Sequence, residues 1–179
     1  MNIQSQVNSQ TWNFQNSYVE LPTKFYMKQL PAPVKNPQII YYNMSLAKEL
    51  GLEFLSEEKV ATVEYLSGNK IPGGALPISQ AYAGHQFGHF TMLGDGRAVL
   101  LGEQINQNNQ RYDIQLKGSG QTPYSRSGDG RATLSSMLRE YIISESIHHL
   151  GIPTTRSLAV AQTGEKVYRE TINDGAVLT

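Results

Sequence analysis

Two neighbouring segments carry the pattern of β-strands. Residues 97–104 are rich in apolar side chains, and residues 112–117 alternate between polar and apolar side chains, as half-buried strands do. The polar stretch 106–110 between them has the composition of a turn. We therefore predict a β-hairpin over these residues.

The clearest helical pattern covers residues 133–150. Apolar side chains recur there three and four positions apart, on a stripe formed by Leu134, Leu138, Tyr141 and Ile142. Gly151 and Pro153 follow, and these residue types end a helix because glycine accepts a left-handed backbone and proline cannot continue the helix. We predict one long helix that packs on the sheet.

The remaining segments predict shorter elements. Residues 43–51 begin with a polar residue and end in glycine, as a short helix does, and residues 56–66 predict a second one. Further expected elements are a strand at 25–27, a hairpin of 156–162 and 167–171 that turns at 163–165, and a last strand at 176–179. Together the segments predict an α+β fold with a mainly antiparallel sheet.

The two ends of the chain differ in character. Residues 1–16 are polar and rich in Asn, Gln and Ser, so we expect a flexible tail there and a folded unit over residues 17–179. The last residues read as the middle of a strand, which leads us to expect a piece of a longer protein.

Composition narrows the functional classes. The 179 residues carry 15 basic and 15 acidic side chains, and this balance argues against a general nucleic-acid-binding protein. There is no cysteine, which excludes disulfides and cysteine-ligated zinc in this chain. No apolar run approaches the ~18 residues of a membrane span, and the N-terminus lacks a secretory signal. We expect no membrane association and a cytoplasmic, bacterial-type location, although a mitochondrial matrix would also suit the chain.

The pentapeptide Gly-Asp-Gly-Arg-Ala occurs twice, at residues 94–98 and 128–132. Glycines let a backbone approach a ligand closely, successive N–H groups in such a turn can form an anion-binding nest, and arginine adds a positive charge. The first copy, with Gly94, Gly96 and Arg97, therefore predicts a phosphate site. A tight turn without a ligand is the alternative.

Lys117 and Glu140 predict an ion pair. Lys117 ends the expected strand just before Gly118-Ser-Gly120, and Glu140 lies inside the expected long helix. A strand lysine held by a helix glutamate is the arrangement that neutralises nucleotide phosphates in kinases. The alternative is a pair of ordinary solvated charges.

The second glycine turn leads directly into the long helix. Its Asp129 has three possible roles at this stage: it caps the helix, contacts a base or ribose hydroxyl, or pairs with an arginine. Gly130 follows it in the turn.

Two other groups of side chains carry weaker signals. His85 and His89 have the i, i+4 spacing of metal ligands if their segment is helical, but no third ligand is evident and packing is the alternative. The run Tyr124-Ser-Arg126-Ser supplies hydroxyls and a cation without assembling a Ser/His/Asp triad.

Taken together, the motifs closely resemble those of the selenoprotein O (YdiU-like) family. The resemblance runs from about residue 11 to the last residue and includes Tyr82-Ala-Gly-His-Gln-Phe-Gly-His89, Leu93-Gly-Asp-Gly-Arg-Ala98, Asp113-Ile-Gln-Leu-Lys-Gly-Ser-Gly120, Arg139-Glu140-Tyr141 and Gly151-Ile-Pro-Thr-Thr-Arg156. It implies a protein-kinase-like N-lobe with an N-terminal extension, and a pseudokinase-type protein adenylyltransferase. Such an enzyme binds ATP in a flipped orientation and transfers AMP to hydroxyl side chains of proteins.

The resemblance also implies roles for individual residues. The nucleotide would be contacted by Gly94, Gly96, Arg97, Lys117, Asp129 and Gly130, with Glu140 holding Lys117. The catalytic base and the Mg²⁺ ligands would lie downstream of Thr179, so we expect no metal site in this chain and no transfer activity from it alone. A non-catalytic nucleotide-binding or partner-binding module is the alternative, and conventional phosphotransfer is a third possibility.

Overall fold

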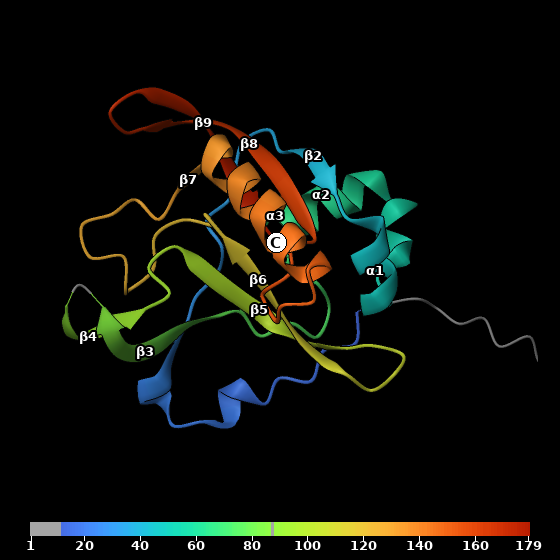
Figure 1. Ribbon diagram of the computed structural model, residues 1–179, viewed down its shortest axis with the longest axis horizontal. Coiled ribbons are helices and arrows are strands. Elements are labelled where there is room, and N and C mark those ends of the chain that lie inside the picture. Colours follow the sequence, from blue (N-terminus) through green and yellow to red (C-terminus); the bar gives the residue numbers. More distant parts are fainter. Residues whose placement is uncertain (1–11, 87) are drawn as a thin grey trace, which may run out of the picture.

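The computed structural model describes residues 12–86 and 88–179 (Figure 1). Its helices are α1 (Met44–Leu50), α2 (Lys59–Ser67) and α3 (Leu134–His149), with short 3-10 helices at Tyr18–Glu20, Thr23–Phe25 and Glu53–Ser56. Its strands are β1 (Tyr26–Lys28), β2 (Gln38–Tyr42), β3 (Ile78–Gln86), β4 (His89–Gly94), β5 (Ala98–Ile105), β6 (Arg111–Lys117), β7 (Ala132–Thr133), β8 (Ala159–Tyr168) and β9 (Ile172–Leu178).

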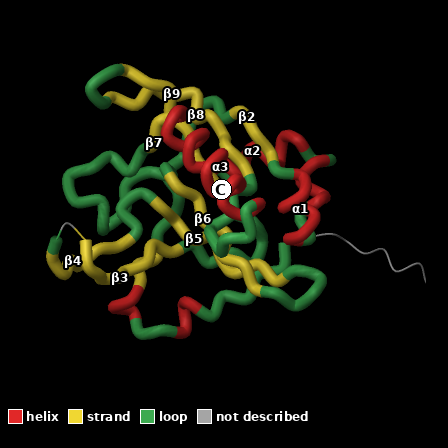
Figure 2. The backbone as a smooth tube through the Cα atoms, viewed as in Figure 1, coloured by secondary structure: helices red, strands yellow, loops and turns green. Residues whose placement is uncertain are grey.

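The strands form one sheet in the order β1-β3-β5-β6-β9-β8-β2, with β4 added beside β3 and β7 beside β9. Every strand pair in the described part of the chain is antiparallel. Figure 2 shows α1 at one side of the sheet, α3 in front of it in the centre of the view, and two short helical segments on the side away from α1. The predicted α+β class, with a mainly antiparallel sheet and one long packed helix, is confirmed.

Helices cover both faces of the β8–β9 part of the sheet. Ala159 and Val177 pack into the core that contains α1 and α2, whereas their neighbours Val160 and Leu178 pack against α3. This division follows from the strand repeat, because successive side chains point to opposite faces. In Figure 1, α3 accordingly lies across β8 and β9, while α1 and α2 lie behind and to the side.

The same alternation gives β6 one apolar and one polar face. Ile114 and Leu116 are buried in the core beneath α1 and α2. The intervening Asp113, Gln115 and Lys117 therefore face the opposite side, where α3 lies. This polar face is the floor of the candidate site.

Local signals place the helices where the sequence predicted them. The side chain of Asn43 accepts a hydrogen bond from the Leu46 N–H and caps α1, which ends at Gly51 with a left-handed φ of 72°. Thr133 caps α3 in the same way by accepting from the Ser136 N–H. The prediction is wrong for one residue of the apolar stripe. Ile142 is 59% exposed, because the buried face of α3 is centred on Met137 and Tyr141.

The predicted hairpin turn at residues 163–165 is also wrong. β8 continues through these residues, and the chain reverses only between β8 and β9, after Tyr168. Gly164, with φ 72°, lies in a bulge where the β8–β9 register shifts, so the glycine marks an irregularity in a strand and not its end. The last strand was expected at 176–179, and it is the end of the longer β9.

Part of the segment expected to be a flexible tail lies against β5. Phe14 forms an isolated antiparallel bridge with Gln104, and the Gln15 N–H donates to the Glu103 carbonyl at 2.9 Å. Trp12 stacks on Phe14 with ring centroids 5.2 Å apart. Residues 12–16 are therefore part of the fold, while residues 1–11 lie outside the described residues.

Candidate functional site

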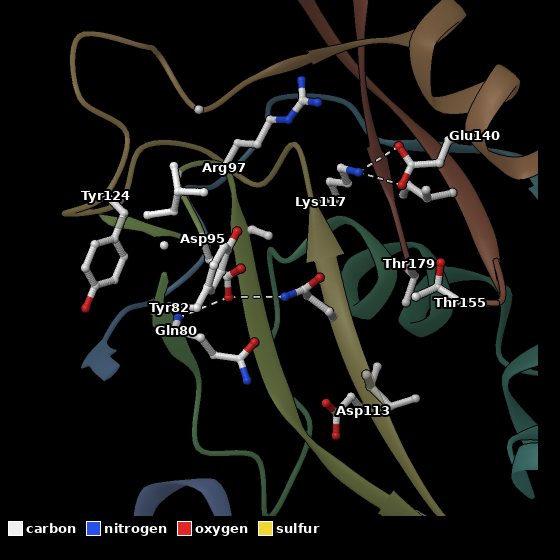
Figure 3. Close-up of a pocket in the computed structure, with 18 of the residues that line it drawn as sticks. Gln80, Tyr82, Asp95, Arg97, Asp113, Lys117, Tyr124, Glu140, Thr155 and Thr179 are labelled. Carbon is white, nitrogen blue, oxygen red and sulfur yellow. Dashed lines mark hydrogen bonds and ion pairs between the residues drawn. The ribbon is translucent and has the colours of Figure 1, made fainter. Parts of the chain in front are cut away.

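Lys117 and Glu140 form an ion pair between the sheet and α3 (Figure 3). Lys117 Nζ lies 2.6 Å from Glu140 Oε1 and 2.8 Å from Oε2. The ammonium is placed by the end of β6, and the carboxylate by the second turn of α3. The two side chains are only 33% and 34% exposed, so the charges meet at the wall of the site and not on open surface.

Arg97 lies next to Lys117 because of the β5–β6 register. Its carbonyl accepts from the Gly118 N–H at 2.7 Å, and the following residue, Ala98, is paired with Lys117. Figure 3 shows the Arg97 side chain on the same side of the cavity as Lys117. The guanidinium has no partner within residues 12–86 and 88–179. Arg97 is thus a cation with free hydrogen-bond donors beside the Lys117–Glu140 pair.

Asp95, between the two glycines of the first turn, is buried with 7% exposure. Its Oδ2 accepts from the Gln80 N–H at 3.0 Å and from Gln115 Nε2 at 3.2 Å. Burial raises the pKa of this carboxyl, although the two hydrogen bonds offset part of the effect. Asp95 therefore fastens the first glycine turn to β3 and β6.

The amides of this turn do not form the predicted anion nest in this conformation. The Asp95 N–H donates to the Gln80 carbonyl at 2.9 Å, and the Gly96 N–H donates to the Gly94 carbonyl at 2.8 Å. A nest needs successive N–H groups that point outward without partners. The cations in this part of the site are consequently side chains, Arg97 and Lys117.

The second glycine turn is held by an arginine on the β8–β9 connection. Arg169 Nη1 and Nη2 each lie 2.8 Å from a carboxylate oxygen of Asp129. These hydrogen bonds lower the pKa of the Asp129 carboxyl, and the Arg131 N–H contributes to the shift. Of the three roles left open, the arginine partner is the one observed. Capping of α3 is excluded because Thr133 caps that helix.

The two copies of the pentapeptide are not equivalent. Arg131 of the second copy donates to the carbonyls of Ala32 and Pro33 and pairs with Glu165 at 3.5 Å. Its counterpart Arg97 has no such contacts. Two features require glycine at position 130. Its φ is 67°, in the left-handed region, and an added Cβ would lie 2.5 Å from the Gln121 N atom. The second copy thus forms a structural turn with an acidic edge.

These residues line one open groove with a volume of about 1510 Å³. Ligand pockets commonly have volumes of about 300–1,000 Å³, so a nucleotide would fill only part of this groove. All six predicted contact residues and Glu140 lie on its wall: Gly94, Gly96, Arg97, Lys117, Asp129, Gly130 and Glu140. The sequence analysis assigned these residues to one site, and in the structure they line the same groove.

Several lining residues were not assigned to the site from the sequence, although Tyr124 was noted there as part of a hydroxyl-rich run. They are Gln80, Tyr82, Asp95, Asp113, Gln115 and Tyr124. Asp113 and Gln115 could have been identified, because the period of two along β6 puts them on the same face as Lys117. No such signal exists for Gln80 or Tyr124, which reach the groove through contacts between distant segments.

The histidine segment is a β-hairpin and not a helix. His85 on β3 pairs with Phe90, and His89 on β4 pairs with Gln86. The i, i+4 helical geometry needed for joint metal ligation is therefore absent. Within the described ranges, no group of three His, Cys, Asp or Glu side chains is placed to hold a metal ion. His149, in the last turn of α3, contacts the Glu145 carbonyl through Nδ1 at 2.7 Å.

Comparison with known proteins gives a consistent family assignment. The sequence profile of the family described as "Protein adenylyltransferase SelO" matches residues 8–179. The chain is 62% identical over 168 residues to the protein nucleotidyltransferase YdiU of Brevibacillus brevis, and 60% identical over 168 residues to that of Halalkalibacterium halodurans. It is 63% identical over 168 residues to that of Syntrophotalea carbinolica. Each alignment covers 94% of this chain.

The alignments cover 34% of each of these relatives. The chain thus spans about a third of the length of the curated relatives it matches. None of the helices in residues 12–86 and 88–179 combines the length and apolar character needed to cross a membrane.

Proposed function

Because this chain belongs to the protein adenylyltransferase SelO family, we propose that it forms the ATP-binding part of an enzyme that transfers AMP to protein hydroxyl groups. The acceptors in this proposal are serine, threonine and tyrosine side chains. The observation that carries the proposal is the Lys117–Glu140 ion pair, with Nζ–Oε distances of 2.6 and 2.8 Å, at the wall of an open polar groove.

The proposed architecture is a protein-kinase-like N-lobe with an N-terminal extension. An antiparallel sheet, a lysine at the end of one strand and a glutamate on the helix that packs against the sheet support it. In this assignment Glu140 fixes the position of the Lys117 ammonium, so that the charge is already in place when a nucleotide enters.

The proposed nucleotide contacts divide the groove into two parts. Lys117 and Arg97 contact the phosphates in this proposal, because Lys117 at the end of β6 lies beside Arg97 of the first glycine turn, and the Arg97 guanidinium has hydrogen-bond donors without partners in the described residues. Gly94 and Gly96 shape that turn. Asp129 and Gly130 form the opposite edge, where the carboxylate suits a hydroxyl or amino group of the nucleoside better than a phosphate.

The proposed reaction is an in-line displacement at the α-phosphorus. The acceptor oxygen forms a bond to phosphorus, the bond to the oxygen that bridges the α- and β-phosphates breaks, and pyrophosphate leaves. The acceptor proton passes to a base. Negative charge grows on the phosphoryl and leaving oxygens, and the fixed cations Lys117 and Arg97 stabilise it.

The base and the metal ligands are assigned elsewhere. The described residues do not provide a cluster of three metal-ligating side chains, so the groove walls do not fit a resident metal site by themselves. A divalent ion, Mg²⁺ in our proposal, would supply charge neutralisation on the phosphates when bound. We propose that its protein ligands and the catalytic base lie in the two thirds of the relatives' length that this chain does not span, and that this chain alone is inactive. The proposed location is the bacterial cytoplasm.

The position of a radioactive label tests the reaction class. The full-length protein is incubated with ATP labelled at either the α- or the γ-phosphate, together with Mg²⁺, and labelled residues are identified by mass spectrometry. We expect AMP on hydroxyl side chains and loss of the α-label in Lys117→Ala. The control is Lys166→Ala, which removes a lysine paired with Asp174 at 2.6 Å on the exposed β8–β9 hairpin.

The other outcomes identify the alternatives. Transfer of the γ-label would show conventional phosphotransfer. ATP binding without transfer of either label would support a non-catalytic nucleotide-binding module, and unchanged AMP transfer in Lys117→Ala would exclude the proposed role of this lysine.

A further inference from the structure

A short turn at residues 122–125 is docked on the first glycine turn. Thr122 Oγ1 donates to the Asp95 carbonyl at 2.6 Å, and Ser125 Oγ donates to the Gly96 carbonyl. The same two hydroxyls also accept hydrogen bonds from within their own turn, from the Tyr124 N–H at 3.1 Å and the Thr122 N–H at 2.8 Å. The hydroxyl-rich run of the sequence thus holds two carbonyls of the glycine turn.

The Tyr124 ring lies against Gly94, and the backbone of Tyr124 and Ser125 lies against Gly96. A Cβ added to Gly94 would lie 2.7 Å from both Cδ1 and Cδ2 of the Tyr124 ring. A Cβ added to Gly96 would lie 2.8 Å from the Tyr124 carbonyl oxygen. Neither glycine has a positive φ, so backbone conformation does not require glycine at these positions. The requirement is close approach, and in this structure the approaching group is Tyr124.

From these contacts we infer that Tyr124 is a positioning residue for nucleotide binding, and that position 94 is a glycine because the Tyr124 ring packs against it, whereas Gly96 leaves room for the backbone of the 122–125 turn. The 122–125 turn fixes the glycine turn from one side, and Asp95 fixes it to Gln80 and Gln115 from the other. Arg97 is the last residue of the glycine turn and lines the groove (Figure 3). In this inference the contacts on both sides of the turn hold its side chain there. The inference rests on the proposed function, because it concerns how the site holds the phosphate-binding arginine.

A double-mutant cycle separates this role from direct contact between the glycine and the nucleotide. ATP binding to the full-length protein is measured by calorimetry for Gly94→Ala, Tyr124→Ala and the double variant. We expect Gly94→Ala to weaken ATP binding about tenfold or more, because the new methyl group displaces the ring or the turn. In the Tyr124→Ala background the same substitution should change the affinity less than about twofold, since the obstructing ring is gone.

Two matched controls accompany the cycle. Gly84→Ala places a methyl group on β3 where nothing lies within 4 Å, and it should leave ATP binding unchanged. Tyr124→Phe keeps the ring and loses only a hydroxyl that has no hydrogen-bond partner in the described ranges, so it should retain the parent affinity. The parent KM for ATP should likewise be kept in Tyr124→Phe and raised in Tyr124→Ala.

Equal losses from Gly94→Ala in both backgrounds would overturn the inference, because the nucleotide itself would then need the open space. An undiminished affinity in Gly94→Ala would overturn it as well. If Gly94→Ala does not fold, Tyr124→Ala alone decides: unchanged ATP affinity contradicts the inference. In each case Lys117→Ala is measured in parallel, so that a failure of the ATP site as a whole is distinguished from a failure of the Tyr124 role.

Discussion

Arg156 and Glu145 form a bidentate ion pair that joins α3 to the segment just before β8. Arg156 Nε lies 2.9 Å from Glu145 Oε1, and Nη2 lies 2.8 Å from Oε2. Glu145 also accepts from the Ser157 N–H at 2.9 Å and from Asn43 Nδ2 at 2.8 Å. Because Asn43 caps α1, one carboxylate links both helix layers to the sheet.

Removing one member of this pair should destabilise the fold. The side chains of Arg156 and Glu145 are only 15% and 11% exposed, so Arg156→Ala leaves a nearly buried carboxylate without its main partner. We expect a loss of about 3 kcal/mol in the free energy of unfolding, measured by urea denaturation. Lys166→Ala, which breaks an exposed pair, should cost less than about 1 kcal/mol. Equal effects of the two substitutions would contradict this account of the pair.

The buried carboxyl of Asp95 should shape the pH dependence of stability. Its pKa is raised by burial, so the folded state holds a proton at pH values where the unfolded chain has released it. Stability then falls as the pH rises through the raised folded-state pKa.

Asp95→Asn removes this titration while keeping an acceptor for the Gln80 N–H. We expect the variant to gain stability relative to the parent protein at neutral pH, and the gain to shrink as the pH falls below the ordinary aspartate range. Unfolding curves over a pH series measure the difference. A difference that does not vary with pH would contradict the assignment.

The N-terminal segment should contribute to stability through its aromatic side chains. Trp12 stacks on Phe14 and meets the edges of Phe54 and Tyr65, at centroid distances of 6.2 and 5.9 Å. Trp12→Ala should therefore cost about 2 kcal/mol or more, seen as a lower Tm. Tyr168→Ala, which truncates a side chain that is 70% exposed, is the control and should change stability by less than about 0.5 kcal/mol. An unchanged Tm in Trp12→Ala would mean that residues 12–16 are held too weakly to matter.

Elements with local signals could be predicted from the sequence. Asn43 and Gly51 bound α1 because their side-chain and backbone properties act within the helix itself. The β5–β6 hairpin could be predicted in the same way. Alternating polar and apolar side chains indicated β6, and the apolar segment before the short polar turn indicated its partner β5. The pairing of Lys117 with Glu140 was predicted from the kinase arrangement, in which a lysine at the end of a strand is held by a glutamate on the following long helix.

Features that depend on distant contacts could not be predicted. β2 is an edge strand with mostly exposed side chains, and it exists because it pairs with β8, far along the chain. Gly164 suggested a turn, but it lies at a bulge in β8, where its backbone closely approaches the distant residue Asn36. The same holds for the site. The Tyr124 ring contacts Gly94 only in the folded chain, so the sequence motif around Gly94 does not indicate that this contact requires a glycine.

The stability of Lys117→Ala should differ little from that of the parent protein. The pair with Glu140 is about one-third exposed on both sides, and solvent screens its contribution, so we expect a change of less than about 1 kcal/mol. A thermal unfolding curve establishes that the variant is folded before its ligand binding is compared. A large drop in Tm would show that the pair is mainly structural.

The most direct test of the nucleotide site is a calorimetric titration with Mg²⁺ and ATP, comparing the parent protein with Lys117→Ala and Lys166→Ala. We predict saturable binding by the parent protein and by Lys166→Ala. Binding to Lys117→Ala should be weaker by roughly 10- to 100-fold, because one charge-assisted contact to phosphate is lost. Equal affinity in Lys117→Ala and the parent protein, or no binding by the folded full-length protein, would contradict the assignment of this groove as the ATP site.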